Sequence, residues 1–325
     1  MGTSLVTGER GCGGGGLAKA LLERGETVVS FDRRRLSEKP SAIGMLGIES
    51  DLVQVEADLC DAGEVRRVLS ENSVDTVFHL AAETIVGTVQ ASPVQGFESN
   101  VRGTWTLLQG ALELGIERFV FASSDKAYGA HDELPYREDF ALRPTAPYEA
   151  SKAAADLIAR SYWHSYGLHV AVTRFANIYG GGDLNFSRLI PEAVSAAIAG
   201  RAPVLRSDGS PERDFLYVED AASAYLAIVD ALDRDDVRGE AFNAGGGRSY
   251  RVGDVVALIA KLSGTGVEPD IRGEGNPSGE IDKQYVDTAK LRERLGWEPR
   301  VGLEEGLQRT IDWYREHPEA LAPRS

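Results

Sequence analysis

The sequence has few cysteines, no long apolar run and no excess of basic charge. Its 325 residues include only two cysteines, Cys12 and Cys60, which are too few for a disulfide framework, and a reducing, cytoplasmic setting is expected. No apolar stretch is long enough to span a bilayer, and the start of the chain does not read as a secretion signal. A formal net charge of −15 repels nucleic acid and anionic membranes, so neither is expected as a partner.

The composition that remains is that of a globular protein, with 42% hydrophobic and 26% charged residues. The first half of the chain alternates short β-rich runs with helical patterns. This alternation predicts an α/β fold, a doubly wound parallel sheet covered by helices. The expected strands are 4–6, 27–31, 52–55, 76–80, 118–122 and 169–174, and the expected helices are 17–24, 62–70, 94–114 and 148–166.

After residue 176 the alternation becomes irregular, so we expect a first domain at 1–176 and a smaller mixed α/β lobe at 177–325. Three helices are expected in this lobe, at 189–198, 251–262 and 303–314. In doubly wound sheets, ligands bind beyond the carboxyl ends of the strands, and the candidate site residues fall there.

A glycine-rich loop follows the first expected strand and opens a helix. Gly8, Gly11 and Gly14 keep a three-residue spacing, which allows a tight turn and lets a diphosphate approach the backbone at the helix N-terminus. A flexible turn is the alternative, but the strand–loop–helix context favours a nucleotide site. Three further glycines at 13, 15 and 16 lower helix propensity, and the sequence offers no reason for them.

Asp32 ends the second expected strand, where a carboxylate can accept both ribose hydroxyls of adenosine and would repel a 2′-phosphate. NAD is therefore favoured over NADP. Three arginines at 33–35 blur this preference, although a solvated basic turn is the simpler interpretation. Asp58 and Leu59 follow the third strand and suit a contact with the adenine edge, or else a helix N-cap region.

The fourth expected strand ends in His79-Leu80-Ala81-Ala82. The small side chain of Ala81 allows a cofactor to approach closely. We interpret His79 as a packed core histidine rather than a catalyst.

Tyr148 and Lys152 are four residues apart, so they lie on one face of a helix. A lysine ammonium close to a phenol favours the phenolate, and a phenolate near neutral pH can act as a general base toward a hydroxyl. Exposed pairs of this kind are common on helices, so the pair gains weight only from the glycine loop and from Ser123-Ser124-Asp125-Lys126 upstream.

Together, the glycine loop, the serine motif and Tyr-x-x-x-Lys resemble the extended short-chain dehydrogenase/reductase family of nucleotide-sugar epimerases and dehydratases. The resemblance continues through 174–180, 213–221 and 295–299. It implies a Rossmann domain that binds NAD and a second lobe that binds the nucleotide sugar. It also implies that segments near 213–245 pack back on the first domain.

The resemblance assigns roles to three residues. Ser124 would hydrogen-bond the sugar O4, Tyr148 would be the base, and Lys152 would hold the nicotinamide ribose. No metal is expected.

Asp125 and Lys126 discriminate within the family. Epimerases usually carry small or neutral residues there, hexose 4,6-dehydratases carry Asp-Glu, and Asp-Lys resembles the CDP-glucose 4,6-dehydratases. This implies a 4,6-dehydratase in which Asp125 protonates the departing 6-hydroxyl and Lys126 takes the C5 proton. A 4-epimerase is the main alternative, with these two residues as a merely polar strand end. A nucleotide-sensing binding protein is a remote alternative, because such proteins typically lose the Tyr/Lys pair.

Two arginines and one asparagine are candidates for the substrate. Arg188 and Arg213 could bind the diphosphate, since guanidinium forks suit phosphate oxygens. Asn177 could contact the diphosphate or a sugar hydroxyl. The helices at 94–114 and 148–166 resemble the pair that forms a homodimer interface in the family.

The chain departs from the family pattern in two places. Cys12 stands where the glycine loop usually has an aromatic residue, and this bears on how the loop packs. Val86-Gly87-Thr88 replaces an arginine-plus-serine substrate contact, and this bears on which sugar and nucleotide are bound.

Overall fold

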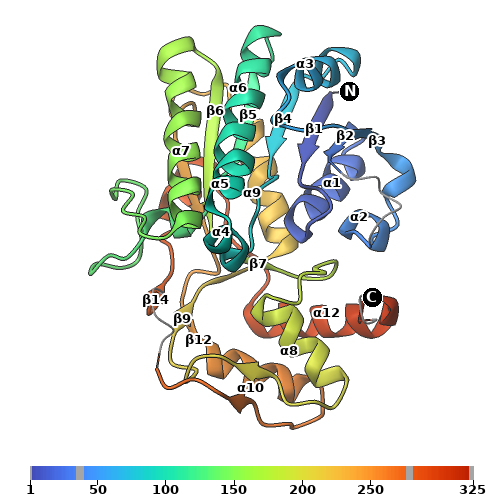
Figure 1. The fold of residues 1–325 in the computed structure, drawn as a ribbon, viewed down its shortest axis with the longest axis vertical. Coiled ribbons are helices and arrows are strands. Elements are labelled where there is room, and N and C mark those ends of the chain that lie inside the picture. Colours follow the sequence, from blue (N-terminus) through green and yellow to red (C-terminus); the bar gives the residue numbers. More distant parts are fainter. Residues whose placement is uncertain (1, 34–39, 276–280, 322–325) are drawn as a thin grey trace.

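The computed structural model describes residues 2–33, 40–275 and 281–321. A seven-stranded parallel sheet in the order β11-β6-β5-β4-β1-β2-β3 lies between helices on both faces (Figure 1). The predicted doubly wound fold is confirmed. Its strands are β1 (Thr3–Thr7), β2 (Thr27–Asp32), β3 (Val53–Glu56), β4 (Thr76–His79), β5 (Arg118–Ala122), β6 (His169–Phe175) and β11 (Ala241–Ala244).

The strands carry apolar residues on both faces, as expected where helices cover a parallel sheet on both sides. In β5, Phe119 and Phe121 enter one buried cluster, while Val120 and Ala122 enter the other. The first cluster is completed by α3 (Ala62–Glu71), α6 (Gly103–Glu113) and α7 (Pro147–Tyr166), and the second by α1 (Cys12–Glu23), α2 (Ala42–Met45), α9 (Val218–Asp230) and α11 (Ala289–Leu295).

The expected helix at 94–114 is a composite. It runs through α5 (Pro93–Phe97), a π-helical turn at Glu98–Arg102 and then α6. A separate short helix, α4 (Val86–Ala91), precedes it.

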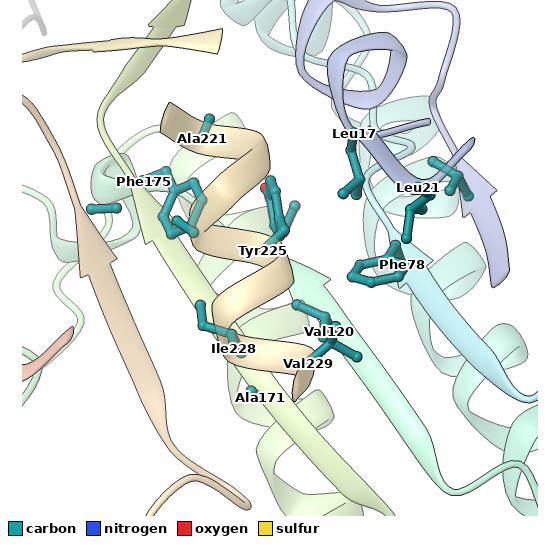
Figure 2. Packing of buried hydrophobic residues seen from close by; sticks show 14 of the residues in the cluster. Leu17, Leu21, Phe78, Val120, Ala171, Phe175, Ala221, Tyr225, Ile228 and Val229 are labelled. Atoms are coloured by element: carbon teal, nitrogen blue, oxygen red, sulfur yellow. The ribbon is translucent and has the colours of Figure 1, made fainter. Parts of the chain in front are cut away.

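Helix α9 comes from late in the chain but packs on the first half of the sheet. Figure 2 shows Tyr225, Ile228 and Val229 of α9 pointing toward Val120 and its neighbouring strands. Strand β11 adds a parallel edge to β6. Residues after 213 therefore complete the sheet and its cover. Strand β10 (Phe215–Tyr217) pairs instead with β7 (Asn177–Tyr179) in a separate two-stranded sheet.

The second lobe has its own core. Helices α8 (Leu189–Ile198), α10 (Val252–Leu262) and α12 (Leu303–Glu316) pack together below the sheet in Figure 1. Small sheets join them: β9 (Glu212–Arg213) lies between β12 (Tyr250–Arg251) and β14 (Lys283–Gln284), and β8 (Val204–Leu205) pairs with β13 (Asp270–Ile271). Within the described ranges, no helix combines the length and apolarity that a membrane crossing requires.

The three glycines that the sequence left unexplained let other elements approach α1 closely. A Cβ on Gly16 would lie 2.6 Å from Cγ2 of Val218, and one on Gly15 would lie 2.7 Å from Cβ of Ala42. A Cβ on Gly13 would be 3.3 Å from Ile178 Cδ1. The cost in helix propensity is therefore offset by close packing of α1 against α9, α2 and β7.

This packing predicts that Gly16→Ala lowers the free energy of unfolding by about 1–3 kcal/mol, the usual cost of overpacking. In a Val218→Ala background the clash is removed. The same substitution should then be neutral or stabilising by up to about 1 kcal/mol, the helix-propensity gain of alanine over glycine. Urea unfolding of the four chains in this cycle measures both effects.

Gly87→Ala in α4 is the matched control, because among the described residues no atom beyond its chain neighbours and its own helix backbone lies within 4 Å of the added Cβ. An unfolding free energy that rises with Gly16→Ala in both backgrounds would show that α1 and α9 are not in tight contact there.

Candidate functional site

The candidate residues gather at the carboxyl edge of the sheet. The glycine loop follows β1, Asp32 ends β2, Ala81 follows β4 and Ser124 follows β5. These four strands are neighbours in the sheet, so the loops that follow them share one edge.

The glycine loop is a close-packed cradle. Gly8 has φ +78°, and a Cβ there would lie 2.7 Å from the backbone nitrogen of Ala81. A Cβ on Gly14 would lie 2.3 Å from the Gly8 carbonyl oxygen, and Gly11 N donates to that same oxygen at 3.1 Å. Ala81 N donates to Thr7 Oγ1 at 3.0 Å, which fixes the adjoining strand end. Side chains are thus excluded where the N-terminus of α1 can receive a diphosphate.

Asp32 is a half-buried residue at the end of β2. Of the arginines that follow it, those at 34 and 35 lie outside the described residues. Asp58 accepts from the backbone of its own turn, and the N-cap of α3 is Asp61, which accepts from the first turn of that helix. Leu59 is half-buried beside Gly103. The adenine contact remains a prediction, and Asp58 is not the cap.

His79 is a core histidine, as the sequence suggested. Its two ring nitrogens hydrogen-bond the hydroxyls of Thr7 at 2.8 Å and Thr104 at 3.0 Å. Burial, helped by the charge of Lys152, lowers the pKa of His79 to about 3. The imidazole is therefore neutral and holds β4 against its neighbours.

The start of α7 positions Tyr148 in the first helical turn. Glu149 Oε2 accepts from the backbone nitrogens of Thr145 at 3.0 Å and Ala146 at 3.3 Å. These bonds satisfy donors near the helix start, as in a capping arrangement. Ser151 Oγ donates to the Tyr148 carbonyl at 2.7 Å, which ties the same turn to its second half.

Burial is the largest influence on the pKa values of both Tyr148 and Lys152. Lys152 Nζ donates to the Ala122 carbonyl at 2.9 Å, and burial lowers the pKa of this lysine to about 8. Burial raises the pKa of Tyr148 to about 12, and the charge of Asp125 adds to this. The charge of Arg188 and the hydroxyl of Ser124 oppose the rise. Burial is therefore the largest influence on the Tyr148 phenol, and the expectation that Lys152 favours the phenolate stays a prediction.

Ser124, Asp125 and Lys126 form a compact turn. Ser124 Oγ donates to Asp125 Oδ1 at 3.1 Å and accepts from Lys126 N at 3.2 Å, which starts a 3-10 turn at Asp125–Tyr128. Asp125 is 3% exposed, and burial raises its pKa to about 6 against the opposing influence of Lys126. Among the described residues, Asp125 Oδ2 has no hydrogen-bond partner. Such a carboxyl can hold a proton near neutral pH and donate it.

Sequence reasoning missed a second buried carboxyl beside this turn. Asp214 accepts from Gly246 N at 2.8 Å, and burial raises its pKa to about 7, with a contribution from the charge of Asp125. The available signal was its position directly after Arg213, at the start of the buried strand β10.

The three candidates for substrate binding make different contacts in the structure. Arg188 pairs with Asp183 at 2.8 Å and donates to the Ile178 carbonyl at 2.8 Å, and its charge acts on Tyr148. Arg213 donates to its neighbour's carbonyl at 2.9 Å, and its charge acts on Asp125. Asn177 Nδ2 donates to the Asp214 carbonyl at 3.1 Å, a bond that supports the backbone. Substrate contact by each of the three remains a prediction.

The two departures from the family pattern have structural counterparts. Cys12 is 5% exposed and joins the core of the second lobe, with Sγ 3.8 Å from the Gly181 carbonyl oxygen. The loop is therefore anchored on the second lobe by a thiol. The segment 86–88 forms the start of α4.

The family model described as GDP-mannose 4,6 dehydratase matches residues 5–310. The chain belongs to this family. It is 35% identical to a trifunctional UDP-glucose 4,6-dehydratase/3,5-epimerase/reductase of Arabidopsis thaliana over 82% of its own length, and it spans 39% of the length of that relative.

Two solved structures are similar to this chain over almost its whole length. A UDP-glucose 4-epimerase of Thermotoga maritima with UDP-glucose has a TM-score of 0.89 at 29% identity, with coverage of 97% of this chain and 99% of that one. A double mutant of dTDP-glucose 4,6-dehydratase from Streptomyces venezuelae with NAD bound has a TM-score of 0.88 at 30% identity, with coverage of 99% and 100%.

Proposed function

We propose that the protein is an NAD-dependent nucleotide-sugar 4,6-dehydratase that forms a 4-keto-6-deoxy sugar. The observation that carries this proposal is the turn after β5, where the buried carboxyl of Asp125 lies between Ser124 and Lys126. A 4-epimerase needs no acid for a 6-hydroxyl and no base for C5. A buried proton donor paired with an amine suits the elimination of water.

NAD fits the glycine cradle, and when bound it accepts and returns hydride and brings a positively charged nicotinamide ring. Gly8, Gly11 and Gly14 would receive its diphosphate, and Asp32 would accept from the adenosine ribose. Ala81, Asp58 and Leu59 would line the adenosine and nicotinamide ends. Lys152 would hold the nicotinamide ribose.

Each side chain near the sugar has a separate role in the proposed reaction. Tyr148 takes the proton of the 4-hydroxyl, with Ser124 hydrogen-bonded to the same oxygen. Lys126 removes the proton at C5, which a 4-ketone acidifies, and Asp125 protonates the departing 6-hydroxyl. Arg188, Arg213 and Asn177 would bind the diphosphate and a sugar hydroxyl.

The Asp125-Lys126 pair supports a CDP-glucose-like substrate, whereas the relatives named above are enzymes of UDP- and dTDP-glucose. A 4-epimerase is the second candidate, because the likeness to a UDP-glucose 4-epimerase is as close as that to a dehydratase.

Incubation with CDP-, UDP- and dTDP-glucose separates these candidates. We expect a product that absorbs in alkali, as 4-keto-6-deoxy sugars do, and that is formed fastest from CDP-glucose. A galactose-configured product without this chromophore would identify an epimerase, and no turnover of any sugar would leave a binding protein.

A homodimer is part of this proposal. Apolar side chains remain exposed on the helices that the resemblance implicates, with Leu157 57% and Tyr166 62% exposed on α7 and Val94 72% exposed on α5. Exposed apolar area of this kind favours association of two copies.

A further inference from the structure

The glycine loop contains a buried acid that the proposed chemistry does not use. Glu9 lies between Gly8 and Gly11, and its side chain turns inward to β2, where Ser30 Oγ donates to Glu9 Oε1 at 2.6 Å. Glu9 is 0% exposed. Its second oxygen, Oε2, has no hydrogen-bond partner within the described part of the chain.

The backbone of Glu9 forms part of the glycine cradle, and its side chain is buried beneath the loop. A Cβ on Gly14 would lie 2.7 Å from Glu9 Cα, and one on Gly15 would lie 3.1 Å from the Glu9 carbonyl oxygen. Ser30, the partner of Glu9, is two residues before Asp32, on the same face of β2. The carboxyl is thus built into the wall between the diphosphate cradle and the proposed ribose contact.

The two charges near the Glu9 carboxyl act on its ionisation in opposite directions. Asp32 faces it from β2 and disfavours its ionisation, while the charge of Arg10 in the same loop favours ionisation. Burial is the largest influence and raises the pKa of Glu9 to about 7, against the hydrogen bond from Ser30. Near neutral pH, Glu9 therefore exists in both a neutral and an anionic form.

We propose that Glu9 links cofactor binding to pH, so that NAD binds tightly when Glu9 is protonated and more weakly when Glu9 is ionised. The dinucleotide brings a diphosphate, and a carboxylate in the wall of its cradle repels that charge. Because the protonated form binds better, NAD must in turn favour protonation of Glu9, and binding takes up a proton. The inference rests on NAD as the cofactor of the proposed function, but not on the sugar reaction.

The test is calorimetric titration of the full chain, freed of nucleotide, with NAD at pH 6, 7.5 and 9. The wild-type Kd should rise about tenfold from pH 6 to pH 9, the order expected for one added charge roughly 10 Å away at an effective dielectric of about 20. Glu9→Gln keeps the hydrogen-bond acceptor for Ser30 and cannot ionise, so its Kd should be close to the wild-type value at pH 6 and should rise much less toward pH 9. Any slope that this variant keeps belongs to other groups, such as Lys152, whose lowered pKa of about 8 lies in the same range.

Glu26→Gln is the matched control. Glu26 also accepts a serine hydroxyl, from Ser4 at 2.6 Å, but it follows α1 at the opposite end of the sheet from the cradle. This variant should keep the wild-type pH profile. Ser30→Ala removes a bond that lowers the pKa of Glu9, so its profile should shift to higher pH. A merely structural role of the Glu9–Ser30 bond would not produce that shift.

Titrations at pH 7.5 in two buffers of different ionisation enthalpy measure proton uptake directly. We expect more proton uptake in the wild type than in Glu9→Gln. A wild-type Kd that is equal at pH 6 and pH 9, or a Glu9→Gln chain that keeps the wild-type slope, overturns the inference while the proposed function stands. No NAD binding at any pH overturns both.

Discussion

Tyr148→Phe should abolish turnover of the nucleotide sugar and leave the fold intact. The ring keeps its packing in the first turn of α7 and loses only its hydroxyl. General-base catalysis is worth roughly a hundredfold to ten-thousandfold in rate. We therefore expect kcat to fall by at least about a hundredfold, measured as formation of the keto product.

Tyr162→Phe is the matched control for this variant. It lies on the same helix, and its hydroxyl donates to Gln109 Oε1 at 3.2 Å, away from the site. Its kcat should be that of the wild type, and both variants should unfold at the wild-type temperature. A Tyr148→Phe enzyme with a near-normal rate would remove this phenol from the mechanism.

Lys126→Ala should oxidise C4 of the sugar and then stop. The dehydratase chemistry needs a base for the C5 proton, and the half-buried amine after Asp125 is the proposed base. Addition of substrate should therefore produce the absorbance of reduced nicotinamide on the enzyme without release of a 6-deoxy product. Asp125→Asn should stop at the same point, because it removes the proton for the 6-hydroxyl.

Two further measurements sharpen this result. Lys261→Ala in α10 removes a lysine of the second lobe that lies far along the chain from the turn after β5, and it should leave turnover unchanged. Wild-type enzyme in heavy water should give a product with deuterium at C5. Absence of solvent label at both C5 and C6, or a simple C4 epimer as product, would show that Asp125 and Lys126 are only a polar strand end.

The sequence was sufficient where local patterns decide the structure. Six of the seven strands of the main sheet and the helix Leu189–Ile198 were predicted from apolar runs bounded by turn residues. The site at the carboxyl edge followed from the order of elements, because parallel strands bring their ends together. Two motifs about 140 residues apart, the glycine loop and the Tyr148–Lys152 pair, could therefore be placed at one edge.

The pKa values and the close packing around the site could not be predicted from the sequence, because they depend on burial by distant parts of the chain. From the sequence, Tyr148 is a phenol four residues before a lysine. Its raised pKa comes from burial, which depends on tertiary packing. Nothing in the local sequence shows that Glu9 and Asp214 are buried. The glycines at 13, 15 and 16 had no explanation in the sequence, and their reason appears only when α9, α2 and β7 are seen against α1.

The position of α9 and β11 also sets an order for biosynthesis. A chain that has reached only Ala176 carries every residue of the glycine cradle and the Tyr148–Lys152 pair. It still lacks the helix that covers Val120 and Ala171 and the strand that pairs with β6. These contacts join segments far apart in the sequence, which slows folding and leaves apolar surface exposed meanwhile. The seven-stranded sheet is therefore complete only after residue 244 has left the ribosome.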